Sequence, residues 1–384
     1  MSVPTANATT PPPWGVYVHI PWCEHHCHYC NFNVVVEKTP AFEAYSKAVL
    51  TQWEVLKSAF TSPPSTLFFG GGTPSLHPPQ LLAPIIESLQ LTRDAEITLE
   101  ANPGDISASR LSQWKDIGIT RLSLGIQTFN PNFGRFLARG HTVKQSRALV
   151  KQVADAGFPT WSVDILFAVP GQSLADFQED LNAICDTKPP HVSLYGLTAE
   201  PDTPYGDAVQ AGKLTEATGD QWRAMYDMTC DLLGEQGFEQ YEHVSFAQAG
   251  HRCVHNQLYW RGHNYAGLGA GAHGFLPDGR RTIGLLQPSA FIKHPKNWEL
   301  NENPSSEQAA HDLLISCLRH QDGVDLGDLA KLGWRLQQDT VQTLVERGLA
   351  HRSDTQIRLT RQGWCLMDAV TLKLMDGLLR QHEN

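Results

Sequence analysis

Six short apolar runs alternate with longer amphipathic stretches across the first two thirds of the chain. The apolar runs have the length of strands, and the amphipathic stretches have the spacing of helices. We predict strands at residues 15–20, 66–69, 96–100, 121–126, 162–167 and 192–197. We predict helices at residues 41–60, 79–89, 107–118, 143–156 and 174–185. Connections long enough for crossover helices imply a parallel sheet, so the predicted fold is α/β, a partial (β/α)6 barrel.

Unusual residues follow these strands, at the point where each strand ends. A cysteine-rich segment, residues 23–30, follows the first strand, and Gly-Gly-Gly-Thr-Pro-Ser at residues 70–75 follows the second. Glu100 ends the third strand, Gln127 ends the fourth, and Asp164 lies within the fifth. The working residues of such folds sit at the carboxyl ends of the strands. We therefore expect these groups to meet at one rim.

The segment 23–30 contains Cys23, Cys27 and Cys30 in the spacing C-x3-C-x2-C, with no fourth cysteine nearby. Thiolates are the ligands of iron–sulfur clusters, and four of them close a [4Fe–4S] cube. Three thiolates leave one iron open, able to bind a small molecule and to pass it an electron. The spacing therefore predicts an open-site [4Fe–4S] cluster.

The same segment is compatible with a structural zinc site of three cysteines and one histidine. The fourth ligand would be one of the nearby histidines His19, His25, His26 or His28. Most zinc sites pair two short clusters, and no second Cys/His pair at this spacing lies near the segment. Disulfides are not expected, because eight cysteines in 384 residues is far below the density of a disulfide scaffold.

Several residues at the rim have the chemistry to bind a polar ligand. The glycines before Thr73 would let the backbone approach a ligand and would leave amide groups free to bind it; a tight turn without a ligand is the alternative. Glu100 and Asp164 lie in otherwise apolar strands and suit a ribose hydroxyl or an ammonium group. Arg139 could hold a carboxylate. The alternative for each charged residue is a structural hydrogen bond or salt bridge.

The pattern changes after about residue 245. Residues 255–274 form a turn-rich stretch that contains HNQLYW and GLGAGAHG. Helices are predicted at 311–320, 326–332 and 336–347, followed by a hairpin at 349–359 and a last helix. This order resembles a winged helix, but acidic residues outnumber basic ones in 305–384, whereas a DNA-reading module should be basic. We therefore expect a packing or lid domain.

Four parts of the chain are expected from these patterns. They are a disordered N-terminus (1–13), a core barrel (14–245), a connecting segment (246–304) and a mainly helical C-terminal domain (305–384). The net charge of −10 argues against nucleic acid or anionic lipid as partners. The first basic residue is Lys38, and no apolar run approaches the length of a membrane span. We expect a cytoplasmic protein with no transmembrane segment.

Five segments resemble the radical S-adenosylmethionine (SAM) superfamily, and within it the oxygen-independent coproporphyrinogen III oxidase-like group. They are YVHIPWCEHHCHYCNF, FFGGGTPSL, LEANPG, LSLGIQTF and DILFAVPGQ. The resemblance implies that Cys23, Cys27 and Cys30 hold the cluster and that SAM chelates the open iron. An electron from the cluster would then cleave SAM to methionine and a 5′-deoxyadenosyl radical.

The resemblance also implies a SAM-binding set. Gly71, Gly72 and Thr73 would meet the amino group of SAM, and Tyr29 would lie beside the adenine. The other SAM-contacting positions would be Tyr17, Glu100, Gln127, Arg139 and Asp164. Two positions, Ala138 and Ala168, carry alanine where the family often has glycine, so the loops around them are expected to be shaped differently.

Two features distinguish branches of the group. The dehydrogenases have a further cysteine where this chain has Phe32, and the hexapeptide HNQLYW resembles the heme chaperone branch, the HemW type. In that branch His255 would be a possible heme-iron ligand, and Tyr259 and Trp260 could stack on the porphyrin.

Other assignments of this region stay open. Cys253 or His251 could ligate the iron instead of His255. Alternatively, the hexapeptide only caps and packs the end of the barrel.

The resemblance leaves two functions open. One is a heme chaperone that binds a [4Fe–4S] cluster, SAM and heme, and delivers heme to acceptor apoproteins such as respiratory cytochromes. The other is a radical SAM enzyme, either a coproporphyrinogen III dehydrogenase or a related methyltransferase. Phe32 counts against the dehydrogenase, and HNQLYW favours the chaperone. Both functions imply an electron donor such as flavodoxin or ferredoxin.

Overall fold

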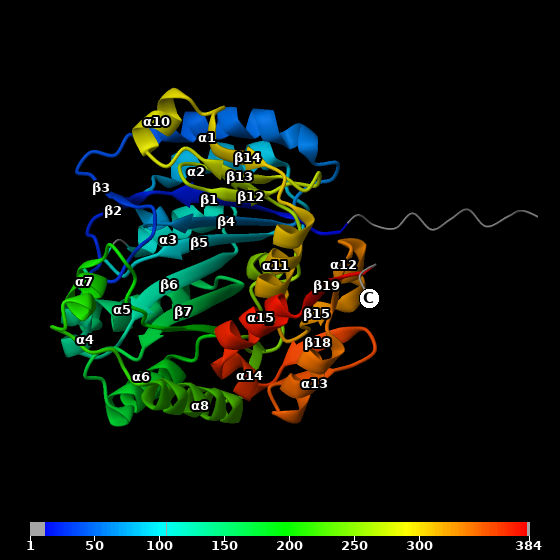
Figure 1. Cartoon of the computed structure of the whole chain (residues 1–384). Helices are drawn as coiled ribbons and strands as arrows, with labels where there is room; N and C mark the ends of the chain where they lie inside the picture. Colours follow the sequence, from blue (N-terminus) through cyan, green and yellow to red (C-terminus); the bar gives the residue numbers. More distant parts are fainter. Residues whose placement is uncertain (1–11, 105, 382–384) are drawn as a thin grey trace, which may run out of the picture.

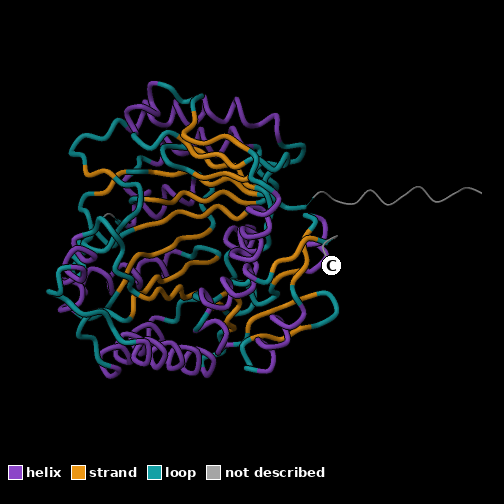
Figure 2. Tube along the Cα trace, viewed as in Figure 1, coloured by secondary structure: helices purple, strands orange, loops and turns teal. Residues whose placement is uncertain are grey.

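The computed structural model describes residues 12–104 and 106–381, and a twelve-stranded sheet lies at its centre (Figure 1; Figure 2). Its strands are β1 (Gly15–Ile20), β4 (Thr66–Gly71), β5 (Glu96–Ala101), β6 (Arg121–Gln127), β7 (Thr160–Phe167), β8 (His191–Gly196), β9 (Glu239–Glu242), β10 (Ser245–Ala247), β11 (Tyr265–Leu268), β12 (His273–Phe275), β13 (Arg281–Gly284) and β14 (Trp298–Glu302). They lie in the order β14-β13-β12-β11-β1-β4-β5-β6-β7-β8-β10-β9. The neighbours from β11 to β8 run parallel, and antiparallel strands extend both ends.

Helices that follow the parallel strands in sequence cover the outer face of the curved sheet (Figure 1). They include α1 (Phe42–Leu56), α2 (Pro79–Leu89), α3 (Ala108–Asp116), α5 (Val143–Ala156), α6 (Leu174–Thr187) and α8 (Gly219–Glu235). Shorter helices are α4 (Pro131–Phe136), α7 (Pro204–Gln210) and α10 (Pro288–Lys293). The six predicted strands and five predicted helices are all present, so the predicted α/β barrel architecture is confirmed.

Alternating side chains of the parallel strands face the helices and the barrel interior. In β1, Val16 and Val18 are buried in the main hydrophobic core, whereas Tyr17 and His19 line an interior cavity. The strand register continues this inner row, because Tyr17 lies beside Phe68 of β4. Parallel sheets are usually apolar on both faces. The polar inner row therefore marks the barrel interior as a place for a polar ligand.

The C-terminal elements form a second hydrophobic core of their own. They are α11 (Ser306–Cys317), β15 (Val324–Asp325), α12 (Leu326–Lys331), β16 (Trp334–Leu336), α13 (Gln338–Glu346), β17 (Ala350–Arg352), β18 (Gln356–Leu359), α14 (Arg361–Cys365), α15 (Met367–Asp376) and β19 (Leu378–Arg380). A three-stranded sheet, β15-β18-β17, accompanies the helices. This is the predicted winged-helix-like arrangement.

The stretch 255–274 differs from its predicted turn-rich character. HNQLYW forms most of a helix, α9 (Val254–Trp260), and the glycine-rich sequence after it begins in strand β11, which pairs in parallel with β1. Three further strands, β12 to β14, extend the sheet from there. The glycines in β11, β12 and β13 concealed these three strands, because glycine is depleted in strands and enriched in turns.

The remaining expectations about the chain concern its ends and its parts. Most of the predicted disordered N-terminus, residues 1–11, lies outside the described residues. In the part of the chain that the structure describes, no helix is both long enough and apolar enough to cross a bilayer. The division at residues 245 and 304 stays a prediction.

Candidate functional site

The cysteine segment lies beyond β1, between two short parallel strands, β2 (Trp22–Cys23) and β3 (Val35–Val36). Cys23, Cys27 and Cys30 are free and partly buried. Burial raises the pKa of Cys23 to about 11, although a hydrogen bond from Thr73 lowers it, and the adjacent Cys30 and Cys27 raise it further. The structure thus brings the three predicted cluster ligands close together.

A chain of hydrogen bonds connects two of the three cysteines. The Thr73 hydroxyl donates to Cys23 Sγ (3.4 Å), and Asn102 Nδ2 donates to Thr73 Oγ1 (3.0 Å). Arg139 Nη2 donates to Asn102 Oδ1 (2.6 Å), and Arg139 Nη1 donates to Cys27 Sγ (3.4 Å). Sequence reasoning did not select Asn102. Its position directly after the strand that contains Glu100 was the signal that could have identified it as a site residue.

The donor set fits a three-thiolate cluster. Hydrogen bonds to the sulfurs tune such clusters, and Thr73 and Arg139 supply them to Cys23 and Cys27. Among residues 12–104 and 106–381, no three His, Cys, Asp or Glu side chains converge on a position for a single metal ion. A cube does not require that convergence, because its thiolates hold different irons.

Three of the four histidines considered as zinc ligands bond to backbone carbonyl groups instead. His19 Nε2 pairs with the Asn33 carbonyl (2.8 Å) and His26 Nε2 with the Cys30 carbonyl (3.1 Å). His28 Nδ1 pairs with the carbonyl of Phe136 (3.1 Å). These contacts favour structural roles over zinc ligation.

The glycine-rich loop after β4 differs from expectation in one respect. Its amides are not free: the Gly71 amide donates to Glu100 Oε2 (3.1 Å), and the amides of Gly72 and Thr73 donate to the carbonyls of Ile20 (2.8 Å) and Trp22 (2.8 Å). The prediction of free amides is therefore wrong. These bonds fix the loop against the strand that leads into the cysteine segment. An ammonium group needs acceptors, so it would meet carbonyl oxygens of this loop.

Glu100 and Asp164 face one interior cavity of about 200 Å³. Burial raises the pKa of Glu100 to about 8, the charge of Asp164 raises it further, and the Gly71 amide opposes both effects. Burial also raises the pKa of Asp164, although the Ser123 hydroxyl donates to it (2.8 Å). The other oxygen of Asp164, Oδ1, has no hydrogen-bond partner among the described residues. This carboxyl pair suits hydroxyl or ammonium groups of a ligand.

Arg139 brings two further predicted residues to the same place. Its Nη1 donates to the Tyr29 hydroxyl (3.4 Å), and its Nη2 donates to the carbonyl of Gly125 (2.7 Å). A Cβ atom on Gly125 would lie close to both Arg139 Nη2 (3.2 Å) and Gln127 Nε2 (3.3 Å), so these two side chains meet beside that glycine. Gln127 has a left-handed backbone (φ 69°), which is unusual for a residue other than glycine and is common at ligand sites. The buried Nε of Arg139 has no acceptor in the described part of the chain.

The two alanines at which glycine was expected also have left-handed backbones. Ala138 has a φ of 54° and Ala168 a φ of 60°. Glycine adopts this conformation at least cost, yet the alanines adopt it here. The departure from the family pattern therefore does not prevent the glycine-like backbone at these positions.

His255 is fully buried and lines only the smaller cavity, of about 200 Å³. Its Nδ1 is hydrogen-bonded to the Thr66 hydroxyl (2.7 Å) and its Nε2 to the Tyr259 hydroxyl (2.6 Å), and its ring stacks on Phe68. Burial lowers its pKa to about 3. Both ring nitrogens are thus occupied, and a role as iron ligand would require one bond to break. For His255, the structure therefore favours a packing role over a role as heme-iron ligand.

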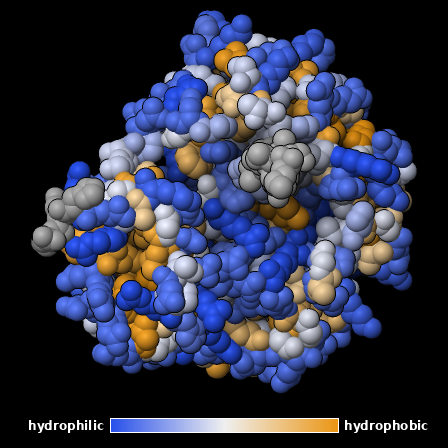
Figure 3. Space-filling model, turned by 90° about the vertical axis from the view of Figure 1, so that its right-hand side faces the viewer, coloured by the Kyte–Doolittle hydropathy of each residue, from blue (hydrophilic) through white to orange (hydrophobic). Residues whose placement is uncertain are grey.

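A second cavity of about 1400 Å³ opens beside the first. Tyr17, Glu100 and Tyr259 line both cavities and so separate them, and Trp260 lines only the larger one. Of the predicted heme-contacting residues, Tyr259 and Trp260 therefore line the larger cavity, and His255 does not. Figure 3 shows a hollow near the centre of one face of the molecule.

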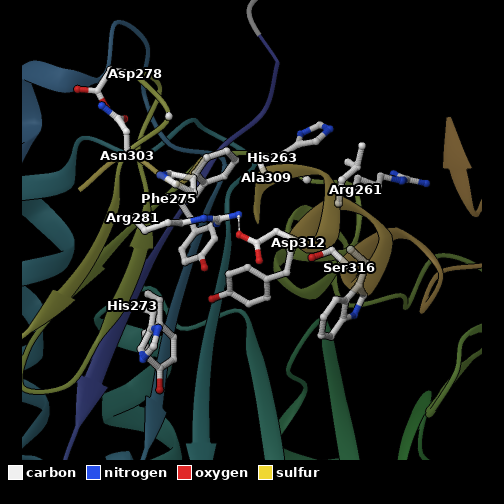
Figure 4. Close-up of a pocket in the computed structure, with 18 of the residues that line it drawn as sticks. Arg261, His263, His273, Phe275, Asp278, Arg281, Asn303, Ala309, Asp312 and Ser316 are labelled. Carbon is white, nitrogen blue, oxygen red and sulfur yellow. Dashed lines mark hydrogen bonds and ion pairs between the residues drawn. The ribbon is translucent and has the colours of Figure 1, made fainter. Parts of the chain in front are cut away.

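The larger cavity lies between the extended sheet and the C-terminal elements (Figure 4). His273, Phe275 and Arg281 come from β12 and β13, and Asp312 and Ser316 come from α11. Arg281 reaches across to Asp312, with a nitrogen–oxygen distance of 2.8 Å. Burial lowers the pKa of His273, and the charge of Arg281 lowers it further.

Comparisons with known proteins agree with this geometry. Residues 17–184 match the model of the radical SAM superfamily. A heme chaperone HemW from Bacillus subtilis is 33% identical over 372 residues, which are 93% of this chain and 97% of that protein. A mitochondrial radical S-adenosyl methionine domain-containing protein 1 from Danio rerio is 38% identical over 73% of this chain and 66% of its own length.

Among solved structures, the coproporphyrinogen III oxidase HemN of Escherichia coli has the same fold. It superposes with a TM-score of 0.79 over 94% of this chain and 90% of its own, at 19% identity. The similarity to the Bacillus subtilis HemW is nearly full-length at one third identity, so it is stronger evidence for the family than the likeness in fold to HemN. The chain therefore belongs to the HemW family of the radical SAM superfamily.

Proposed function

We propose that the protein is a heme carrier that binds a [4Fe–4S] cluster and SAM and delivers heme to acceptor apoproteins such as respiratory cytochromes. The cavity of about 1400 Å³ carries this proposal, because it extends beyond the usual range for one small ligand and has aromatic walls. Its lining reaches Gly71 and Glu100 at the strand ends beside the cysteine segment. The naming of HemW relatives as heme chaperones supports the same function.

The chain's own residues would bind the cluster and SAM near the strand ends. Cys23, Cys27 and Cys30 would hold the cluster, which would offer SAM an open iron to chelate and could supply it an electron. Glu100 and Asp164 would accept hydrogen bonds from SAM, and Arg139 would keep Tyr29 beside the cysteine segment. An electron donor such as flavodoxin or ferredoxin would reduce the cluster.

The cluster is tested by anaerobic reconstitution of the full chain. We expect about four irons and four sulfides per chain, because a [4Fe–4S] cube has that composition. Replacing Cys23, Cys27 or Cys30 with alanine should abolish binding, whereas Cys365→Ala is the control and should not. Stoichiometric zinc, with no charge-transfer absorbance, would contradict the cluster.

The carrier function is tested by titrating reconstituted protein with heme and then adding an apocytochrome. A carrier that must release its cargo should bind with a Kd of about 1 µM, roughly −8 kcal/mol. We expect saturable binding followed by transfer to the apocytochrome. Absence of saturable binding by the wild-type chain would refute the carrier.

The alternative is a radical SAM enzyme acting on coproporphyrinogen III, which the same cavity could admit. Phe32 stands where the dehydrogenases have a cysteine, and it is 65% exposed at the cavity. We expect no protoporphyrinogen IX when coproporphyrinogen III, SAM and a reductant are supplied. Detection of that product would make the protein a heme-synthesis enzyme.

A further inference from the structure

The larger cavity contains few side chains that could ligate heme iron. Histidine, cysteine, methionine and tyrosine are the usual axial ligands, and the described lining contains no cysteine or methionine. Its tyrosines are hydrogen-bonded to other side chains, Tyr17 to His19, Tyr259 to His255 and Tyr265 to Arg281. Its histidines are His19, His263 and His273. His19 uses both ring nitrogens, for the Tyr17 hydroxyl (3.0 Å) and the Asn33 carbonyl (2.8 Å).

The other two histidines differ in position and in hydrogen bonding. His263 Nδ1 pairs with the carbonyl of Pro13 (2.9 Å), in the loop between α9 and β11. His273 is exposed to the cavity, and neither of its ring nitrogens has a hydrogen-bond partner within residues 12–104 and 106–381. Figure 4 shows the two at different ends of the site. His273 is thus the histidine with both nitrogens available.

Close backbone packing fixes the position of His273. A Cβ atom on Gly267 of β11 would meet the backbone carbonyl of His273 at 1.9 Å, so the two strands approach closely at this point. The His273 side chain is exposed and lines the larger cavity. That exposure gives a flat macrocycle access to the imidazole.

The next row of the same wall has the chemistry for the edge of a porphyrin. Tyr265, Phe275 and Arg281 are directly paired across β11, β12 and β13, so their side chains share one face. The Arg281 guanidinium stacks on the Phe275 ring at 3.8 Å from its centroid. Its buried Nε has no acceptor among the described residues, although Asp312 accepts from another nitrogen. A heme propionate would supply that acceptor.

We propose that heme binds in this cavity with His273 as the axial iron ligand and Arg281 as the partner of a propionate. This inference rests on the proposed carrier function and moves the ligand from the HNQLYW helix to strand β12. The opposite wall is α11, whose Ala309 and Leu313 provide apolar contact.

The test titrates full-length, cluster-loaded protein with heme and follows the Soret band. His273→Ala should shift the band and weaken binding by at least about 10- to 100-fold, because losing even an outer-shell partner of a metal ligand typically costs that much. Added imidazole should restore the wild-type spectrum in His273→Ala, which a merely structural role would not allow. His263→Ala, at the other end of the cavity, is the matched control and should bind as the wild type does.

The propionate contact is tested with a second ligand. Arg281→Ala should weaken heme binding about tenfold, the effect of losing a hydrogen bond to a charged group, but should not weaken binding of heme dimethyl ester. If His273→Ala is unstable by circular dichroism, His273→Gln keeps a polar side chain of similar size and should show the same spectral shift.

The outcomes separate this inference from the carrier function. Saturable heme binding by the wild type with an unchanged spectrum in the His273 variants would overturn the inference and leave the carrier standing. Loss of heme binding in the wild type itself would overturn the carrier function.

Discussion

The pKa of Glu100 gives a stability prediction at the scale of a single residue. The folded-state pKa is about 8, so between its usual value and pH 8 the folded protein keeps a proton that the unfolded chain has lost. Raising the pH across this window therefore lowers the free energy of unfolding, by about 1.4 kcal/mol per pH unit at most. The neighbouring Asp164 contributes to the shift.

Glu100→Gln should therefore raise the melting temperature of ligand-free protein at pH 9 and change it little at pH 4. The glutamine cannot ionise, so it avoids the cost of a buried charge. Glu87→Gln, on the exposed side of α2, is the control. A melting-temperature difference that is equal at both pH values would contradict the assignment of this cost to Glu100.

Ala168 allows a second prediction at this scale. A left-handed backbone costs an L-residue roughly 1–2 kcal/mol, part of which glycine avoids. Ala168→Gly should therefore not destabilise the protein and should raise its melting temperature by a few degrees. Ala148→Gly, at an exposed position of helix α5, should lower it, since glycine is a poor helix residue. Equal destabilisation by Ala168→Gly and Ala148→Gly would contradict backbone strain at Ala168.

The predicted and observed site residues differ where a residue's partner is distant in the sequence. The positions of Glu100 and Gln127 near strand ends, and of Asp164 within a strand, follow from periodicity and could be read from the sequence. The occupied nitrogens of His255 could not, because its partner Thr66 comes from a distant strand. The role of Asn102 was hidden similarly, since it depends on Arg139 lying beside it.

At the scale of elements, the parallel strands were predictable and the strands that extend them were not. The six predicted strands have apolar runs and long helical connections, which are strong local signals. Strands β11 to β14 are short, β11 to β13 each contain a glycine, and of the four only β11 pairs with β1. The sequence therefore predicted the barrel but missed the wall of the larger cavity.

The contact between the glycine loop and the cysteine segment makes a prediction about two elements. A Cβ atom on Gly72 would lie 2.7 Å from the Trp22 carbonyl oxygen and 3.0 Å from that of Ile20. Gly72→Ala must therefore displace the backbone that leads directly into Cys23. We expect lower iron and sulfide content after reconstitution, and weaker SAM binding by calorimetry.

The matched control for this variant is Gly104→Ala. A Cβ atom there would meet no heavy atom of the other described residues within 4 Å, although Gly104 belongs to the loop after β5. Its iron content should equal that of the wild type. Equal iron and equal SAM affinity in both variants would show that the two loops do not constrain each other.

At the scale of the whole molecule, the C-terminal elements complete the larger cavity. Backbone hydrogen bonds attach them to the sheet, from the His243 amide to the Arg319 carbonyl (2.8 Å) and from the Gln321 amide to the Tyr241 carbonyl (3.0 Å). Arg361 of α14 adds ion pairs to Asp227 and Asp231 of α8 (2.8 and 2.7 Å). The helix α11 that faces β12 and β13 is therefore held in place as one side of the cavity.

Because one cavity reaches both the strand ends and this wall, SAM and heme should bind together. The residues expected to meet SAM, such as Gly71 and Glu100, lie on β4 and β5, whereas His273 and Arg281 lie on β12 and β13. A volume of about 1400 Å³ exceeds the usual 300–1000 Å³ of a small-molecule pocket and leaves room for both. We expect heme titrations at saturating SAM to give full stoichiometry.

Any change in heme affinity caused by SAM must be matched by a change of the same factor in SAM affinity caused by heme, since coupling is reciprocal. Displacement of one ligand by the other in equilibrium dialysis would mean that the two sites overlap.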